Sequence, residues 1–484
     1  MLGHLLGVVA IIEAVLLLIP ALVALVYSEP VWPFLATIAI LTAISLPLVV
    51  FKPQNRRIFA KEGFICVTGA WIMLSVFGSL PFVFSGAIPS YVDAIFETVS
   101  GFTTTGATIL TAIEHLPRGI LFWRSFTHWV GGMGVLVFML ALLPNIGGEA
   151  MYLLRAEVPG PTKGKLVPKI RHTAVILYGI YLALTAMEAI ALLCTGLPLY
   201  DSVVTALATA GTGGYSVKDL SMAGYANPAA EWIVAIFMVV FSINFNLYYF
   251  IIIKKARDVW KNEELRTFFV IMAAAILLLT ASTYHTFDGI FECLRGVFFQ
   301  TASIMSTTGF ATVNYDEWSS FAKSIIVVLT FLGACAGSTA GGLKISRVIL
   351  VVKNIFKEIK HVLRPNSVNV VRMDGESVSE ETLRGTSNYL SIYFTLIVIF
   401  TLLISIDGFG FEANLTAVIT CINNVGPGLG IIGPVGNFSG FSAFSKIVLT
   451  ITMLAGRLEI LPLIIFFSPS AWKKSVKIGL QKKG

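Results

Sequence analysis

Long apolar stretches separated by short polar connectors dominate the sequence. Ten of them approach the roughly 20 residues that a helix needs to cross a bilayer. The chain of 484 residues is 56% hydrophobic and only 13% charged, whereas soluble domains average about 25% charged residues. The sequence therefore predicts an all-α membrane protein. Its spans are expected near residues 4–27, 33–51, 63–85, 120–144, 172–196, 230–253, 267–283, 322–351, 388–406 and 441–467.

Basic residues are concentrated in alternate connectors. Loops rich in Lys and Arg face the cytoplasm, and an even number of spans returns the chain to the same side. Both termini are therefore expected to be cytoplasmic. Because the basic residues are confined to loops, the net charge of +7 does not indicate a nucleic-acid partner. Most of the 34 Lys and Arg lie in 52–61, 155–171, 254–266, 344–384 and 473–483.

The connectors on the opposite side combine a short apolar run with a cluster of Gly and Thr, Ser or Asn. These runs, within 86–119, 197–229, 284–321 and 407–440, are too short to span. They suit re-entrant helices, because non-helical backbone at membrane depth must be buried in protein or line a wet cavity. Asp93 and Asp201 suit the N-caps of the first two. A gapless alignment of the clusters superimposes Gly106, Gly214, Gly309 and Gly428.

The alignment predicts a fourfold repeat of span, re-entrant pore helix and span, written M1-P-M2, around one pore. Two extra N-terminal transmembrane helices precede the repeats. The expected units are 1–52 for the N-terminal pair, 53–150, 151–260, 261–360 with a broken inner helix, and 361–484 with a basic cytoplasmic tail.

The clusters have the chemistry that a dehydrated cation requires. Carbonyl oxygens of converging backbone can replace the water shell of the ion, and glycine adopts the unusual dihedral angles at little cost. Pore-helix C-termini would add partial negative charge. One such cluster is weak evidence, but four in register predict an ion filter. The fourth copy lacks the hydroxyls, so its oxygens must come from the backbone. The predicted filter residues are Thr104, Thr105, Gly106, Thr212, Gly213, Gly214, Thr307, Thr308, Gly309, Val425, Gly426, Pro427 and Gly428.

The predicted span 322–351 is interrupted by four glycines. Because glycine costs roughly 1 kcal/mol in a helix interior, the middle is expected either to form a loop beneath the filter or to pack closely against another helix. Arg457 is the basic residue deep in a predicted span, where a charge needs a partner or a pathway. It is expected to hydrogen-bond the loop, with Glu459 and Glu188 as alternative partners. The predicted gate comprises Gly337, Ser338, Thr339, Gly341, Gly342 and Arg457.

Several motifs, distributed over essentially the whole chain, resemble the TrkH/TrkG branch of the Trk/Ktr/HKT superfamily of K⁺ transporters. They are Thr-Thr-Thr-Gly-Ala at 103–107, Thr-Gly-Gly-Tyr-Ser at 212–216, Ser-Thr-Thr-Gly-Phe at 306–310, Asn-Asn-Val-Gly-Pro-Gly-Leu-Gly at 423–430, His-Trp-Val-Gly-Gly-Met-Gly at 128–134, Ala-Gly-Ser-Thr-Ala-Gly-Gly-Leu-Lys at 336–344 and Gly-Arg-Leu-Glu-Ile at 456–460. The resemblance implies a homodimer with one pore per subunit, a loop gate, and a cytosolic TrkA-like ring that binds nucleotide. Glycine at position 106 implies a preference for K⁺ over Na⁺.

The expected function is K⁺ uptake across the cytoplasmic membrane, and the protein is not expected to be an enzyme. K⁺ is the expected transported ion, and no nucleotide is expected on this chain, which has no GxGxxG or Walker pattern. A secondary transporter with another substrate is the main alternative, but such folds usually show two inverted repeats. A receptor or structural role would leave the four clusters unexplained. The basic stretch 344–384 is a candidate docking surface. Passive and ion-coupled transport remain open.

Overall fold

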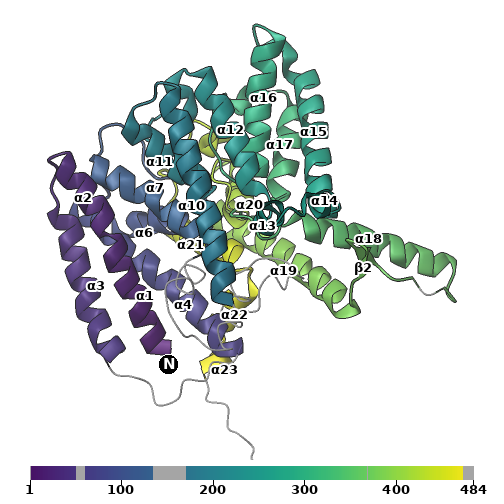
Figure 1. Ribbon diagram of the computed structural model, residues 1–484, viewed down its shortest axis with the longest axis horizontal. Helices are drawn as coiled ribbons and strands as arrows, with labels where there is room; N and C mark the ends of the chain where they lie inside the picture. Colours follow the sequence, from purple (N-terminus) through teal and green to yellow (C-terminus); the bar gives the residue numbers. More distant parts are fainter. Residues whose placement is uncertain (1, 51–59, 135–169, 368, 473–484) are drawn as a thin grey trace, which may run out of the picture.

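The computed structural model describes residues 2–50, 60–134, 170–367 and 369–472. Apart from one short hairpin, its regular structure is helical (Figure 1). The first half contains α1 Leu2–Leu16, α2 Leu18–Val26, α3 Trp32–Val50, α4 Ala60–Gly78, α5 Leu80–Phe84, α6 Tyr91–Phe102, α7 Arg118–Gly132, α10 Ile170–Cys194, α11 Leu199–Ala210, α12 Pro228–Ser242 and α13 Phe245–Ile252. The second half contains α14 Ala256–Trp260, α15 Glu263–Thr283, α16 Ile290–Met305, α17 Ser320–Phe331, α18 Ile345–Leu363, β1 Arg372–Met373, β2 Glu376–Ser377, α19 Glu380–Ile404, α20 Phe411–Ile422, α21 Ala443–Arg457, α22 Leu461–Phe467 and α23 Pro469–Trp472.

Within the described ranges, six segments are helical, long and apolar enough to cross a membrane, which confirms the predicted all-helical membrane architecture. The N-terminal pair, Leu2–Val26 and Trp32–Val50, was predicted from the sequence and is present. The remaining segments are Lys61–Phe84, Ala174–Cys194, Glu263–Thr286 and Glu380–Asp407.

The other four predicted spans are not continuous helices. α12 and α13 meet at an angle of 91°, α17 ends at Phe331 and α21 ends at Arg457. α7 ends at Gly132, and most of the remainder of the predicted span 120–144 lies outside the described residues. Only the break in 322–351 was predicted. Hydropathy averages over a window, so it detects apolar character but not the local backbone geometry that interrupts a helix.

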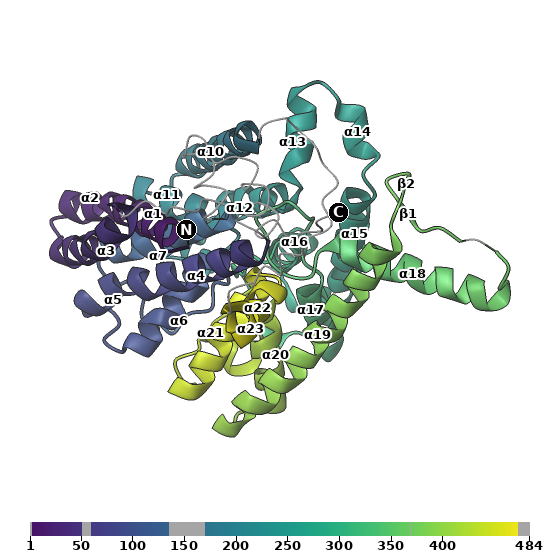
Figure 2. The same cartoon turned by 90° about the horizontal axis from the view of Figure 1, so that it is seen from below.

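Four short helices, α6, α11, α16 and α20, lie between the longer ones and end near a common centre (Figure 2). Their C-terminal halves are buried. The expected Asp N-caps are wrong: Ser90 caps α6 by accepting from the Asp93 amide at 3.4 Å, and Pro198 precedes α11. Asp93 and Asp201 lie instead in the first turns, where a negative charge favours the helix dipole.

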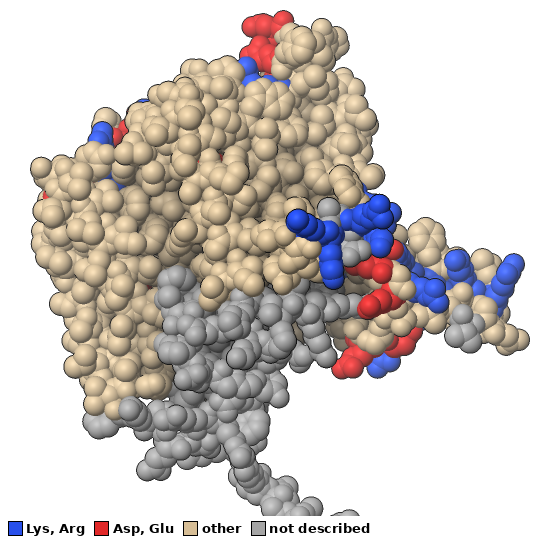
Figure 3. Space-filling view, viewed as in Figure 1, with Lys and Arg blue, Asp and Glu red and all other residues tan. Residues whose placement is uncertain are grey.

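In the view of Figure 3, the charged residues on the surface lie toward the ends of the molecule. Figure 3 shows a broad surface without charges, with Lys and Arg gathered near α14 and α18 at one end. The exposed residues there include Lys254, Lys255 and Arg257. α18 and the β1–β2 hairpin project from the body on the side opposite to α1 and α3 (Figures 1 and 2). This distribution matches a protein whose middle is surrounded by lipid.

Two inner helices approach the ends of the short helices closely enough that only glycine fits. A methyl group on Gly131 of α7 would lie 1.8 Å from the carbonyl oxygen of Phe102, the last residue of α6. A methyl group on Gly456 of α21 would lie 2.1 Å from the carbonyl oxygen of Ile422, the last residue of α20. The same contact therefore recurs at the ends of α6 and α20.

We predict that Gly131→Ala and Gly456→Ala lower the thermal unfolding temperature of the detergent-solubilised protein. The added methyl group must displace backbone, and overpacking of this kind costs about 1–3 kcal/mol. Gly179→Ala is the matched control, because Gly179 lies on α10 with no atom near the position of the added methyl group. Unfolding temperatures equal to that of the unchanged protein for both variants would contradict the packing described.

Candidate functional site

All four short helices end in the same unusual turn. The second residue after each helix has a left-handed backbone, with φ of 57° at Thr104, 55° at Thr212, 57° at Thr307 and 54° at Asn424. The next amide donates to the carbonyl five residues earlier at 2.9 Å in each copy. This is the Schellman arrangement, which usually places glycine at the left-handed position. A β-branched threonine there is strained by roughly 1–2 kcal/mol, so surrounding contacts must hold it.

The common turn corrects the predicted alignment of the fourth copy. The glycines with positive φ two residues after the left-handed position are Gly106, Gly214, Gly309 and Gly426. Gly428 lies two residues further on, where its amide donates to the Ile432 carbonyl at 2.7 Å. The equivalent residue to the three threonines is therefore Asn424. Glycines flank Pro427 on both sides, so the sequence alone does not show whether Gly426 or Gly428 is equivalent to the glycines of the other three copies.

The four segments surround one axis in cyclic order. A methyl group added to each glycine would meet the carbonyl oxygen of the residue before the glycine in the next copy. The distances are 2.0 Å from Gly106 to Gly213, 2.0 Å from Gly214 to Thr308, 2.1 Å from Gly309 to Val425 and 2.6 Å from Gly426 to Thr105. Any side chain would displace these carbonyls. The glycines are therefore required by the contact between neighbouring copies as well as by their dihedral angles.

This ring can offer neutral oxygen atoms to a cation. Each short helix ends four residues before its glycine, so the partial negative charges of four helix C-termini lie beside the ring. Among the described residues, no group of three or more His, Cys, Asp or Glu side chains could hold a metal ion. The oxygens available in the ring are those of carbonyls and hydroxyls, which is the chemistry of ion filters in channels.

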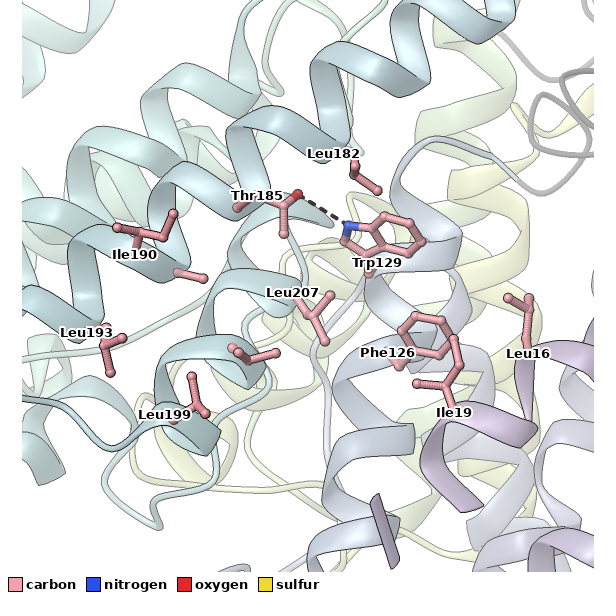
Figure 4. Close-up of a pocket in the computed structure, with 13 residues that line it drawn as sticks. Leu16, Ile19, Phe126, Trp129, Leu182, Thr185, Ile190, Leu193, Leu199 and Leu207 are labelled. Atoms are coloured by element: carbon pink, nitrogen blue, oxygen red, sulfur yellow. Dashed lines mark hydrogen bonds between the residues drawn. The ribbon is translucent and has the colours of Figure 1, made fainter. Parts of the chain in front are cut away.

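An apolar pocket on the outside of the helices has none of this chemistry. It has a volume of about 640 Å³ and lies between α1, α2, α7, α10 and α11 (Figure 4). Its polar group, the Thr185 hydroxyl, accepts from Trp129 Nε1 at 3.2 Å and donates to the Tyr181 carbonyl at 2.8 Å. The pocket therefore offers no free oxygen along a path for ions.

The irregular segment 332–344 lies against the left-handed residues of the ring. Thr307 Oγ1 accepts from the Gly341 amide at 2.8 Å, and Asn423 Oδ1 accepts from the Leu343 amide at 3.3 Å. On the other side the Gly337 carbonyl accepts from the Phe245 amide, where α13 begins, at 2.9 Å. The segment is thus a loop rather than a closely packed helix, in agreement with the first of the two predicted alternatives.

Arg457 contacts this loop, as predicted from the sequence. Its guanidinium donates to the Thr339 carbonyl at 3.0 Å and lies 3.5 Å from the Thr104 hydroxyl. It also donates to the carbonyls of Gly131 and Gly132, at the end of α7, at 2.5 and 2.9 Å. Arg457 therefore connects the end of α21 with the end of α7 and with the loop.

Glu459 and Glu188 were the alternative partners predicted for Arg457. Glu459 lies in the break between α21 and α22 and pairs with Arg347 of α18 at 2.6 Å. Glu459 and Ile460 have φ of 60° and 62°, so the backbone reverses there and separates the Glu459 side chain from that of Arg457. Glu188 is fully buried in α10.

Two residues that hold the loop were not found from the sequence. One carboxylate oxygen of Glu264 accepts from the amides of Ala336 and Ser346, both at 2.9 Å, so it joins the loop to the first turn of α18. Lys344 Nζ donates to the carbonyls of Ala340 and Gly341. A charged residue at the start of a membrane helix was the available signal for Glu264, but its partner lies 72 residues away.

Comparison with known proteins agrees with this architecture. The profile of the TrkH family, described as cation transport protein, matches residues 33–475. The chain is 33% identical to the Trk system potassium uptake protein TrkH of Salmonella typhimurium over 476 residues, covering 97% of this chain and 98% of that protein. It is 30% identical to the Trk system potassium uptake protein TrkG of Escherichia coli over 479 residues, with 97% and 98% covered.

A solved structure is similar over almost its full length. The crystal structure of the potassium transporter TrkH from Vibrio parahaemolyticus matches with a TM-score of 0.87 and 30% identity, covering 98% of this chain and 99% of that one. The names of these proteins denote transport and not catalysis, in line with the expectation from the sequence. Because the family profile and full-length relatives match nearly the entire chain, this protein belongs to the TrkH family of cation transport proteins.

Proposed function

We propose that this protein carries K⁺ into the cell through the ring of filter carbonyls. The cyclic contact among Gly106, Gly214, Gly309 and Gly426 is the observation that supports the proposal most strongly, because it brings four backbone segments to one axis. The full-length relatives named for potassium uptake support K⁺ as the ion. Four M1-P-M2 units, 53–150, 151–260, 261–360 and 361–484, build the pore, and 1–52 is an addition. The basic connectors and both termini face the cytoplasm.

The loop 332–344 and Arg457 act as the gate in this proposal. The loop occupies the side of the ring formed by Thr104 and Thr307, which is where an ion leaves the filter. A guanidinium at this point repels cations, and water-poor surroundings strengthen the repulsion. Opening then requires that the bond from Arg457 to the Thr339 carbonyl breaks and that the loop moves aside.

The proposed protein partners are a second copy of this chain and a cytosolic nucleotide-binding ring of TrkA type. α18 is the element that projects from the body, and its apolar residues Ile355, Phe356 and Val362 are exposed. Its basic residues are less available than the sequence suggested. Arg347, Lys353 and Lys357 pair with Glu459, Glu263 and Glu380. Docking of an acidic partner surface would therefore use Lys360 and the exposed residues near α14.

We predict that Gly106→Ser and Gly426→Ser lower the K⁺/Na⁺ permeability ratio about fivefold or more. The added side chain would displace a carbonyl of the neighbouring copy. A fivefold change in the permeability ratio corresponds to about the net free energy of one hydrogen bond. Reversal potentials of the purified protein in proteoliposomes with K⁺ and Na⁺ gradients provide the measurement. Gly428→Ser is the matched control, because its side chain would first meet the flexible end of Ile432.

The same measurements test the corrected register. A larger loss of selectivity in Gly428→Ser than in Gly426→Ser would show that the fourth copy was assigned wrongly. Equal permeability to K⁺ and Na⁺ in the unchanged protein would refute the proposed function itself.

We predict that Arg457→Ala and deletion of 337–341 raise K⁺ flux in proteoliposomes that contain no cytosolic partner. Removal of the guanidinium abolishes both the bond to the Thr339 carbonyl and the electrostatic barrier. Lys323→Ala is the control, since Lys323 lies at the start of α17 and pairs with Asp316 at 3.7 Å. Flux that stays at the level of the unchanged protein in both variants would rule out the gate.

A further inference from the structure

A buried ion pair lies directly behind the first two filter segments. Arg124 of α7 donates from Nε to a carboxylate oxygen of Glu97 of α6 at 2.6 Å. The two side chains are 2% and 0% exposed. Desolvation of both charges opposes their attraction, so such a pair is weak evidence for stability. Both side chains also bind the backbone that follows the filter glycines.

Glu97 binds the backbone that follows the first filter glycine. Its first oxygen accepts from the Thr108 hydroxyl at 2.9 Å, and its second accepts from the Ile109 amide at 3.0 Å. Hydrogen bonds to an ionised carboxylate are shorter and stronger than those between neutral groups. Glu97 therefore fixes Thr108 and Ile109 to α6, the short helix that precedes that filter copy.

Arg124 binds the corresponding backbone of the second copy. Its Nη1 donates to the Ser216 carbonyl at 3.0 Å, and its guanidinium lies 3.5 Å from the centre of the Tyr215 ring. Tyr215 in turn reaches across to the first copy, where its hydroxyl lies 2.8 Å from the Glu97 carbonyl and 3.2 Å from the Ala107 carbonyl. Ala107 and Tyr215 each directly follow a filter glycine, so one cluster ties the outer ends of two neighbouring copies together.

The other two copies are held differently. Glu97 lies seven residues before the left-handed Thr104, and the equivalent positions carry Thr205, Gln300 and Ala417. Behind the third copy the Phe310 carbonyl accepts from the Ser303 hydroxyl at 2.6 Å. Behind the fourth, the Leu429 amide donates to the Thr416 hydroxyl at 3.1 Å. An acidic residue at this register position occurs in the first copy alone.

We propose that Glu97, Arg124 and Tyr215 form a clamp that sets the K⁺ over Na⁺ selectivity of the filter. Their bonds hold the backbone beyond Gly106 and Gly214, so the adjacent carbonyls of Thr105 and Gly213 cannot move inward to surround the smaller Na⁺ ion. The three are positioning residues, since they touch the filter backbone from behind. The inference rests on the proposed K⁺ pathway and adds the residues that fix its geometry.

The test measures reversal potentials of Tyr215→Phe and Glu97→Gln in proteoliposomes under K⁺ and Na⁺ gradients. Tyr215→Phe keeps the ring beneath the guanidinium and removes only the hydroxyl that reaches Ala107 and Glu97. We expect the K⁺/Na⁺ permeability ratio to fall about threefold to fivefold in Tyr215→Phe, as for loss of one hydrogen bond, and further in Glu97→Gln. Glu231→Gln is the matched control, because Glu231 pairs with Arg295 at 2.9 Å between α12 and α16.

The outcomes separate the clamp from a purely structural role and from the proposed function. A lower ratio in Tyr215→Phe at an unchanged unfolding temperature, with the control ratio unchanged, supports the clamp. An unchanged ratio in folded Tyr215→Phe overturns it, even if Glu97→Gln fails to fold. An equal fall in Glu231→Gln also overturns it, because any lost ion pair would then have the same effect. If the unchanged protein does not prefer K⁺, the proposed function fails first.

Discussion

The left-handed turn at the end of each short helix is the constraint on which the rest of the structure depends. Thr104, Thr212, Thr307 and Asn424 all adopt it. In each of the four segments, the carbonyl of the next residue therefore lies against the glycine of a neighbouring segment around one axis. Glycine would adopt this backbone without strain. Threonine and asparagine retain side-chain oxygens at the ring, and the surrounding bonds compensate for the strain.

Those compensating bonds connect the ring with the elements that surround it. Thr307 accepts from the loop amide of Gly341, and Thr104 lies beside Arg457. Asn424 donates to the hydroxyl of Thr105 at 2.9 Å and so joins the fourth copy to the first. Movement of the loop or of Arg457 would therefore remove bonds from the strained residues themselves. In the proposed mechanism, gate and filter share these contacts and are not independent.

The breaks after α12 and α21 also position groups that hold the surrounding elements together. α12 turns by 91° into α13, and the Phe245 amide at this corner holds the Gly337 carbonyl of the loop. α21 ends at Arg457, and the reversed backbone at Glu459 directs its carboxylate to Arg347. A continuous helix through the first corner would keep the Phe245 amide within its own hydrogen-bond ladder. The first interruption frees a backbone amide to bind the loop, and the second lets Glu459 pair with α18.

The sequence by itself determined the features that repeat locally along the chain. Apolar length revealed the six long spans, the N-terminal pair among them. Glycine with Thr, Ser or Asn after a short apolar run pointed to the four segments that meet in the ring. The isolated charge of Arg457 pointed to the loop. Only the tertiary structure decided which glycine of the fourth copy joins the ring, because Gly426 and Gly428 differ in backbone angle and neighbours rather than in identity. It also decided the pairing of Glu97 with Arg124 and of Glu264 with Ala336 and Ser346. Those partners lie 27 to 82 residues apart, and no local pattern of polarity encodes contacts over such distances.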